Sequence, residues 1–319
     1  TRLIAVVADN THTDEPSHMD PSEEVATLAA DPKIFRRLAA TLTPRGLTPT
    51  AGEAVALQLA SAGSSGTDMS RGGLHVGYTA DPPLSTASLF HHVRETCGET
   101  VAVLGCEAAT RANAVGEPPQ QGPHVDTDVR LTIYDAIAHA AADLRMTIIR
   151  ALNTGEVAVT SDTHYTTESP AGVVAVGQTR AAADQAPFDA QLAACLDYVV
   201  DLDDASAGKD QPTDQTAADP ASTEYQPVPT AMVDAYLPAV QATTPAVTTA
   251  AKERWNQYKE AADASPPWAP RGSLRATETV PKVSAALARL ELADEVSAEH
   301  TAAAIEWVET ATTYSTVTD

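Results

Sequence analysis

Cysteine is scarce in this sequence, and long apolar runs are absent. Three cysteines, Cys97, Cys106 and Cys195, occur among 319 residues, and none of them forms a Cys-x-x-Cys pair. Such a sparse, odd set is typical of buried free thiols in a reducing compartment. No segment reaches the roughly 18 consecutive apolar residues of a membrane span, and Leu3–Val7 is too short for a signal peptide. We therefore expect a soluble, cytoplasmic protein. Because the chain begins with Thr1 and not Met, we also expect it to be a fragment or a processed protein.

Positive charge is also scarce. The chain has 20 basic and 43 acidic residues, a net charge of −23, and only five of its basic residues are lysine. A general nucleic-acid surface needs clustered Lys and Arg to neutralise phosphates, so this composition argues against one. An acidic surface with abundant Asp, Thr and Ala is typical of a protein from a high-salt (halophilic) cytoplasm, where screening removes most of the self-repulsion. The alternative is an acidic protein that binds basic partners.

What is present predicts a large core with mixed secondary structure. Hydrophobic residues make up 43 % of the chain, and apolar strands alternate with helical patterns over its first two thirds. This alternation favours a largely parallel α/β sheet flanked by helices. The expected strands are Leu74–Thr79, Val101–Leu104, Gly172–Val176 and Leu196–Leu202. The expected helices are Val25–Leu42 (restarting at Pro32 with Asp31 as its cap), Glu53–Ala60, Ser85–Thr96 and Val129–Leu144.

The rest of the chain divides into loops, one hairpin and a helical end. Gly116–Gly122 is expected to be a loop, and Met146–Thr160 a hairpin that turns at Asn153-Thr154-Gly155. Asp203–Glu224 is poor in apolar residues and is the best domain boundary. We therefore divide the chain into an acidic linker (1–24), an α/β core (25–204), a second linker (205–224) and a helical domain (225–319). The expected helices of this last domain are Thr230–Tyr236, Pro245–Ala262, Pro281–Leu292 and Ala298–Thr310.

Two groups of His and acidic residues have the residue types of a metal site. The first group is His12, Asp14, Glu15, His18 and Asp20. Nothing in the sequence fixes its geometry, so a solvated acidic linker is the preferred interpretation. The second group is His124, Asp126 and Asp128, which would share one face of a strand. We prefer a helix-cap role for Asp126 or Asp128, ahead of the expected helix.

The stretch His75–Val93 has the strand–turn–helix pattern in which nucleotide-binding proteins place a phosphate loop. A phosphate loop works through backbone N–H groups, one lysine and one hydroxyl that binds Mg²⁺. This stretch contains no lysine, and proline and leucine stand where glycine and a small polar residue are expected. ATP hydrolysis by the usual route is therefore not expected.

Several segments in this order resemble the C-terminal AAA+ region of minichromosome maintenance (MCM) replicative helicases, over nearly the whole chain. Leu28–Ile34 and Leu42–Leu59 are similar to the first helices of that region, and Gly73–Val76 to the lead into its first strand. Four further segments resemble family elements in the same order. Asp81-Pro82 is similar to part of the phosphate loop, and Asp128–Ile137 to the helix after the Walker B strand. Leu192–Asp204 is similar to the strand with the arginine finger, and Ser273–Val308 to the lid helices. The resemblance implies an AAA+ P-loop-type sheet followed by an all-α lid, residues 225–319, with residues 1–24 including the end of an N-terminal domain.

The family's phosphate-loop residues are changed in this sequence. Without gaps, the loop begins at Ala80, Asp81 and Pro82. Pro83 then stands where a glycine presents its N–H, Thr86 at the lysine position and Ala87 at the hydroxyl position. These changes remove a donor, a charge and a metal ligand.

The family's other catalytic positions change in the same direction. The sensor 1 asparagine aligns with Gln178, and the arginine finger with Cys195, which stabilises no transition-state charge. The sensor 2 arginine corresponds to Arg275. The expected place of the Walker B acidic pair, before Asp126, cannot be a buried strand, and Val157–Asp162 is the less favoured alternative. The hairpin, in the family a DNA-contacting element, has Arg150 as its only basic candidate.

The expected function is therefore a non-catalytic MCM-like AAA+ protein, a scaffold or regulatory partner in DNA replication, with no catalytic residues and no metal. Its partners would be MCM subunits, other replication proteins or further copies of itself, without membrane association; DNA binding by this chain alone is not expected. No cofactor is expected, and ATP with Mg²⁺ would bind only if weak nucleotide affinity is retained. The alternative is a divergent ATP-dependent DNA helicase subunit that uses catalytic groups from neighbouring subunits.

Overall fold

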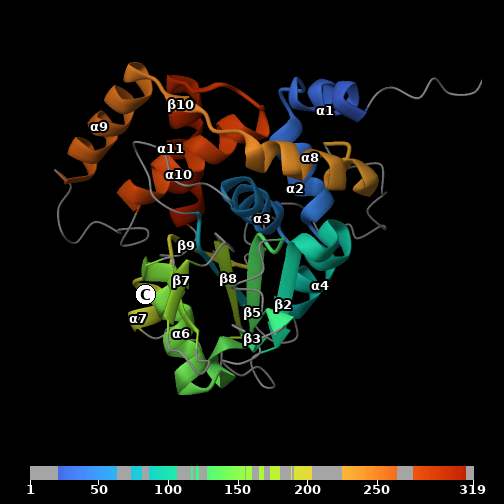
Figure 1. Cartoon of the computed structure of the whole chain (residues 1–319). Helices are drawn as coiled ribbons and strands as arrows, with labels where there is room; N and C mark the ends of the chain where they lie inside the picture. Colours follow the sequence, from blue (N-terminus) through green and yellow to red (C-terminus); the bar gives the residue numbers. More distant parts are fainter. Residues whose placement is uncertain are drawn as a thin grey trace, which may run out of the picture.

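A five-stranded parallel sheet forms the centre of the computed structural model. The structure describes residues 21–62, 73–80, 86–105, 116–117, 120–121, 128–154, 156–159, 165–168, 173–179, 188, 190–202, 225–263 and 276–313. The strands lie in the order β2-β5-β8-β1-β9 (Figure 1). Their bounds are β1 Val76–Ala80, β2 Val101–Gly105, β5 Leu131–Asp135, β8 Val173–Thr179 and β9 Tyr198–Asp201. The expected parallel α/β class and four of these five strands are confirmed.

The strand β5 corrects the largest error of the sequence interpretation. Val129–Leu144 was expected to be a helix, but residues 131–135 form a strand between β2 and β8. Its apolar residues at 131, 133, 134 and 137 suit a helical period, yet Leu-Thr-Ile-Tyr is also a β-branched and aromatic run. Because helices cover both faces of a central parallel strand, its first four residues are all buried. The short 3-10 turn η2 (Ile137–His139) and helix α6 (Ala142–Thr154) follow.

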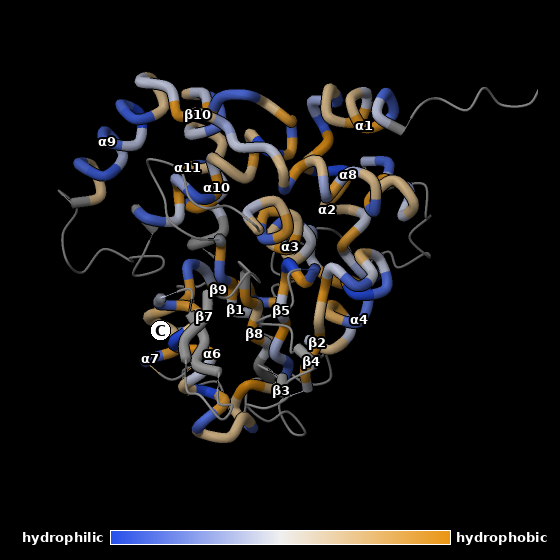
Figure 2. Tube along the Cα trace, in the orientation of Figure 1, coloured by the Kyte–Doolittle hydropathy of each residue, from blue (hydrophilic) through white to orange (hydrophobic). Residues whose placement is uncertain are grey.

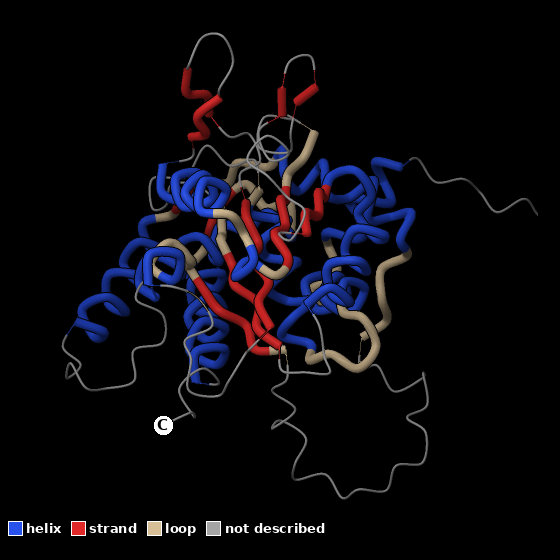
Figure 3. Tube along the Cα trace, turned by 90° about the horizontal axis from the view of Figure 1, so that it is seen from below, coloured by secondary structure: helices blue, strands red, loops and turns tan. Residues whose placement is uncertain are grey.

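The expected hairpin lies further along the chain than the sequence indicated. Residues 146–154 belong to α6, and the hairpin pairs β6 (Glu156–Val159) with β7 (Tyr165–Glu168). The Asn-Thr-Gly sequence was taken as its turn, but such residues also end helices, as happens here at Thr154. The expected loop at residues 116–122 contains a second, minimal hairpin of β3 (Gly116–Glu117) and β4 (Gln120–Gln121). Both hairpins project from the same side of the body (Figure 3).

Three helices precede the sheet. They are α1 (Pro21–Ala29), α2 (Ile34–Leu42) and α3 (Pro49–Ser61). The break near Asp31-Pro32 is confirmed, but α2 begins at Ile34 rather than Pro32. Asp31 accepts a hydrogen bond from the Lys33 N–H at 2.9 Å and pairs with Arg37 at 2.6 Å, so its carboxylate holds the turn ahead of the helix. Gly52 allows α3 to approach α2 closely, because a Cβ there would meet Thr43 and the Ala39 carbonyl.

The remaining helices lie beside the sheet and at the end of the chain. Helix α4 (Thr86–Cys97) leads through the 3-10 turn η1 (Gly98–Thr100) to β2, and the short α7 (Ala190–Ala193) precedes β9. The four expected C-terminal helices are present as α8 (Thr230–Ala242), α9 (Thr249–Asp263), α10 (Ala276–Leu290) and α11 (Ala298–Thr313). The short strands β10 (Ala246–Val247) and β11 (Glu295–Val296) pair in parallel beside them. None of the described helices has both the length and the apolar character needed to cross a membrane.

Helix α3 connects the sheet to a layer made of helices from both ends of the chain. It lies between the strands and the helices α2, α8 and α10 (Figure 1). Thirteen residues long, it is buried from Ala51 to Ser61 and is largely apolar, whereas α9 is mostly hydrophilic (Figure 2). One cluster of buried residues runs from α1–α4 through the strands to α8, α10 and α11. The helices before and after the sheet therefore share one hydrophobic core with it.

Candidate phosphate-loop site

The candidate site lies at the carboxyl ends of β1 and β5, where α4 begins. Open parallel α/β sheets bind their ligands at the carboxyl ends of the strands. β1 ends at Ala80, which is fully buried and paired with Thr179 of β8. The next described residue is Thr86, the first residue of α4. β5 ends at Asp135, whose position in the sheet brings its carboxylate to the start of α4.

A hydroxyl–carboxylate contact defines the site. Thr86 is 2 % exposed, and its Oγ1 donates a hydrogen bond to Asp135 Oδ1. The same oxygen accepts the backbone N–H of Ala136 at 3.0 Å. The Thr86 side chain, at the position aligned with the family's lysine, therefore contacts the β5 carboxylate directly.

Gly177 of β8 makes room for this contact. A Cβ at position 177 would lie 2.8 Å from Thr86 Oγ1 and 2.9 Å from Asp135 Oδ1, and closer still to the Phe90 ring. Those distances are too short for real contacts, so the strand must carry glycine here. The site is thus packed from three elements, α4, β5 and β8.

Ala136 follows the site carboxylate in a left-handed backbone conformation, with φ 56° and ψ 49°. This conformation is uncommon for residues other than Gly, Asn and Asp. It turns the chain from the end of β5 into η2 while presenting the Ala136 N–H to Asp135. The residue after the strand-end aspartate is therefore fixed in position but carries only a methyl group.

Asp135 is the site residue that the sequence interpretation missed. The Walker B strand was sought before Asp126 or at Val157–Asp162, because residues 129–144 were taken as a helix. The structure instead places Leu131–Asp135 between β2 and β8, with one carboxylate at its end and alanine next. Four apolar or β-branched residues followed by an aspartate were the available signal. A buried strand that ends in a carboxylate therefore exists in this part of the chain, after Asp126 rather than before it.

The other sequence-predicted phosphate-loop and sensor positions are only partly brought to this site. Ala87 is exposed in the first turn of α4, and Gln178 pairs with Thr79 in the β8–β1 register. Asp81, Pro82, Pro83 and Arg275 lie outside the described residues. Among the described strand ends and the first turn of α4, no residue is lysine or arginine.

Cys195 lies in the turn between α7 and β9, where the resemblance places the arginine finger. It is buried with the second apolar cluster, which includes Leu152 and Leu192. Its thiol contacts Asn153 Oδ1 at 3.3 Å and donates to the Gln191 carbonyl at 3.1 Å. A buried thiol with these partners packs the turn and supplies no positive charge.

The proposed alternative metal ligands do not form a described site. Asp128 is exposed and precedes a strand, so its expected role as a helix cap is wrong. His124, Asp126 and the acidic residues 12–20 lie outside the described residues. The described residues contain no cluster of three or more His, Cys, Asp or Glu side chains suited to a metal ion. Arg150 lies on α6 rather than on a hairpin.

The chemistry available at the site follows from these positions. A carboxylate and a threonine hydroxyl are the two protein ligands that hold Mg²⁺ in P-loop nucleotide hydrolases. Here they are hydrogen-bonded to each other. The described site offers no cation for the β- and γ-phosphates and no second carboxylate beside Asp135. The site therefore provides one hydroxyl and one carboxylate, and Ala136 cannot act as a general base.

Comparison with known proteins identifies the fold. No family model matches the chain, and no curated protein matches it. Among solved structures, the chain is similar to a full-length MCM homolog from Methanopyrus kandleri, with 18 % sequence identity and a TM-score of 0.66. The match covers 94 % of this chain and 63 % of the MCM homolog, so the chain spans less than two thirds of that protein. The mixed α/β fold, with its parallel five-stranded sheet flanked by helices, is that of an MCM AAA+ region.

Proposed function

We propose that this chain is a non-catalytic MCM-like AAA+ protein that acts as a scaffold or regulatory partner in DNA replication. The observation that carries the proposal is the site itself. Thr86, which we align with the family's lysine, contacts Asp135, and the next residue, Ala136, has no carboxylate. A site of this composition supplies neither phosphate neutralisation nor a base that positions water. The protein keeps the shape of the family and does not use ATP as a fuel.

The proposed partners are MCM subunits, other replication proteins or further copies of this chain. A protein that keeps the fold without hydrolysing ATP can still pack against other subunits through its surface. This reasoning supports protein partners rather than a substrate. Light scattering in molar KCl, on the chain alone and mixed with an active MCM from the same cell, measures the association. The proposal expects this chain to elute in a species heavier than one 33.2 kDa chain, either alone or together with the MCM. A monomer in both samples contradicts the scaffold role.

The second candidate is a divergent ATPase or helicase subunit that uses catalytic groups from its neighbours. The specific observation in its favour is Asp135, a carboxylate at the end of β5 beside the first turn of α4. ATP hydrolysis in molar KCl with Mg²⁺ distinguishes the two candidates. The first expects no turnover by the chain. Turnover that is lost on changing Asp135→Asn, and kept on changing the exposed Asp128→Asn, would establish the second.

A further inference from the structure

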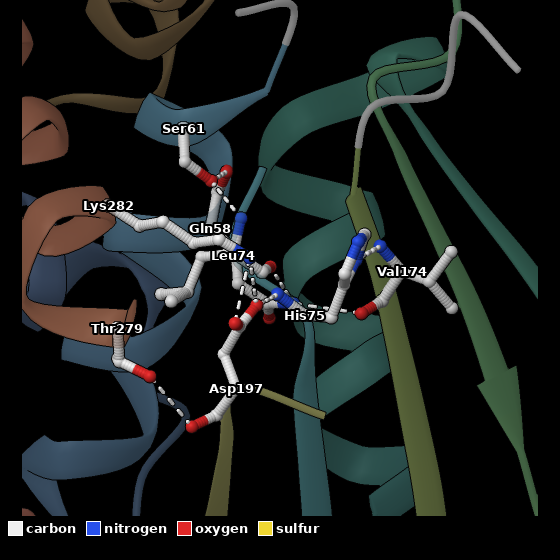
Figure 4. Close-up of polar contacts among 8 residues, drawn as sticks. All are labelled: Gln58, Ser61, Leu74, His75, Val174, Asp197, Thr279 and Lys282. Carbon is white, nitrogen blue, oxygen red and sulfur yellow. Dashed lines mark hydrogen bonds and ion pairs between the residues drawn. The ribbon is translucent and has the colours of Figure 1, made fainter. Parts of the chain in front are cut away.

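A buried polar cluster lies at the amino ends of the strands, whereas the candidate phosphate-loop site lies at their carboxyl ends. It is centred on Asp197 and contains Gln58 and Ser61 of α3, His75 before β1, and Thr279 and Lys282 of α10 (Figure 4). Asp197 and His75 precede their strands, so the cluster sits at the amino ends of β9 and β1. None of its members is used by the proposed function.

Asp197 holds α10 through both its side chain and its backbone. Its carboxylate is fully buried, and Lys282 Nζ, on a side chain 10 % exposed, lies 2.7 Å from Oδ1 and 2.8 Å from Oδ2. Oδ2 also accepts the His75 N–H at 2.8 Å. The Asp197 carbonyl accepts a hydrogen bond from Thr279 Oγ1 at 3.0 Å, one turn before Lys282.

Helix α3 is also hydrogen-bonded to the amino ends of the strands. Gln58 Nε2 donates to the carbonyls of Leu74 and Val174, at 3.3 and 3.2 Å, and Ser61 Oγ accepts the Leu74 N–H at 2.9 Å. His75 Nδ1 accepts the Val174 N–H at 3.2 Å, so the neutral ring carries its proton on Nε2. β1 and β8 are therefore held to α3, while the start of β9 is held to α10.

Two further contacts join α10 and α11 to α3. Arg289 of α10 is buried and donates to the carbonyls of Ala60 and Ser61 at the end of α3, at 3.2 and 3.3 Å. This places a cation at the negative end of the helix, where it is favourable. Trp307 of α11 donates to Glu53 Oε2 at 3.0 Å. All of these contacts would break together if α10 and α11 moved away from the sheet.

Removing the Lys282 ammonium while α10 stays in place would leave the buried Asp197 carboxylate without its cation, and opening of α10 would then hydrate that carboxylate. Breaking a buried ion pair in this way is far more costly than losing a surface pair, because the remaining charge has no compensation. Salt screens buried pairs much less than exposed ones. We propose that the Asp197–Lys282 pair holds the helical layer α10–α11 on the sheet in one arrangement, so that the two move as one body. The turn that carries Cys195, two residues before Asp197, is fixed to α10 by the same pair.

Hydrogen exchange by mass spectrometry in molar KCl tests this proposal on the full chain. In the wild type, peptides from α10 and from β8 should exchange at the same slow rate, through one shared opening. Lys282→Met replaces the charged lysine with an uncharged side chain of similar length. It should speed exchange of α10 by about 100-fold or more, and that of β8 by less than one tenth as much. Lys259→Met, which removes an exposed lysine on α9, should change neither.

Two further variants separate a local effect from loss of folding. Lys282→Arg keeps the charge and should return α10 to within about tenfold of wild-type exchange. Asp197→Asn/Lys282→Met removes both charges, so no lone charge remains to prevent folding, and it should free α10 selectively but less than Lys282→Met does. Equal acceleration of α10 and β8 by Lys282→Met, or no acceleration, overturns the proposal. So does an α10 that already exchanges faster than β8 in the wild type.

Discussion

At the scale of single residues, Asp135 accepts two hydrogen bonds on one carboxylate oxygen, from Thr86 and from the backbone of Ala136. The contact depends on the missing side chain at Gly177, which leaves room for both groups. Thr86 was placed at the lysine position from the sequence alone. Its partner was not, because the residue it meets is 49 positions away and its strand had been taken as a helix.

Gly177→Ala should destabilise the protein by roughly 2 kcal/mol, because the new methyl group overpacks a filled site. Urea unfolding, followed by circular dichroism, measures this difference. Gly105→Ala is the matched control. Gly105 is paired with Asp135 at the same edge of the sheet, but a Cβ there has nothing within 4 Å. The control should change stability by less than about 0.5 kcal/mol. Equal effects of the two substitutions would contradict the packing described at Gly177.

Cys97 should contribute a loss of stability at alkaline pH. Burial, with a smaller effect of the nearby Asp234 carboxylate, raises the pKa of the Cys97 thiol from 9.0 to about 12. Above pH 9 the unfolded chain loses this proton and the folded chain keeps it, so stability falls as pH rises towards 12. Burial raises the pKa of Tyr78 in the same direction. Urea unfolding of wild type and Cys97→Ala at pH 7 and pH 10.5 measures the effect.

The stability difference between wild type and Cys97→Ala should shrink at pH 10.5, by up to about 1.4 kcal/mol per pH unit above pH 9. The pH 7 value is the baseline, because both states are protonated there and the difference reports packing alone. A difference that is unchanged at pH 10.5 would mean that the Cys97 thiol titrates normally in the folded protein.

At the scale of elements, most helices and strands follow from local sequence, and the exceptions have a common cause. Strands β1, β2, β8 and β9 were predicted within a few residues because turns or polar segments bound them. β5 was missed because its apolar spacing fits both a strand and a helix. Only its place between β2 and β8, a long-range contact, decides for the strand. The error then displaced the hairpin and concealed Asp135, so one ambiguous segment accounts for most of the wrong assignments.

Helix α3 should lose much of its attachment to the sheet in Gln58→Leu. The fully buried Gln58 accepts a hydrogen bond from the Tyr78 hydroxyl at 2.6 Å and donates to the carbonyls of Leu74, before β1, and Val174, in β8. Without these bonds, buried polar groups lose their partners, which should cost roughly 3 kcal/mol in the free energy of unfolding. Gln257→Leu, on the exposed side of α9, is the control and should be nearly neutral.

Tyr78→Phe in the Gln58→Leu background removes the stranded hydroxyl and should restore part of the loss. The double-mutant cycle should give a coupling energy of about 1 kcal/mol between the two side chains. Additive effects in this cycle would show that the Gln58–Tyr78 hydrogen bond adds nothing to stability.

At the scale of the whole molecule, the helices that precede and follow the sheet in the chain share one hydrophobic core with it. The helical end of the chain was predicted as a separate domain from its composition. The contacts of α10 and α11 with α3, which composition does not reveal, join it to the shared core. The chain also carries a net charge of −23, whose self-repulsion opposes compaction.

Stability should therefore rise with salt. Raising KCl from 0.1 to about 2 M shortens the screening length from about 10 Å to less than 3 Å and weakens this repulsion. We expect the midpoint of thermal unfolding to increase over this range, measured by circular dichroism. The buried Asp197–Lys282 pair should be little affected by the same salt. A midpoint that falls with KCl would contradict the idea that repulsion among the negative charges limits the stability of the fold.

Isothermal titration calorimetry with ATP and Mg²⁺ in molar KCl tests the central claim most directly, namely that this AAA+ fold no longer uses ATP as a fuel. The chain is predicted to give no binding heat at millimolar nucleotide, because Thr86, which we align with the lysine position, carries no charge and contacts the strand-end carboxylate. Asp135→Asn serves as the matched sample and should give the same trace. Saturable heat from the wild type that disappears in Asp135→Asn would contradict the claim.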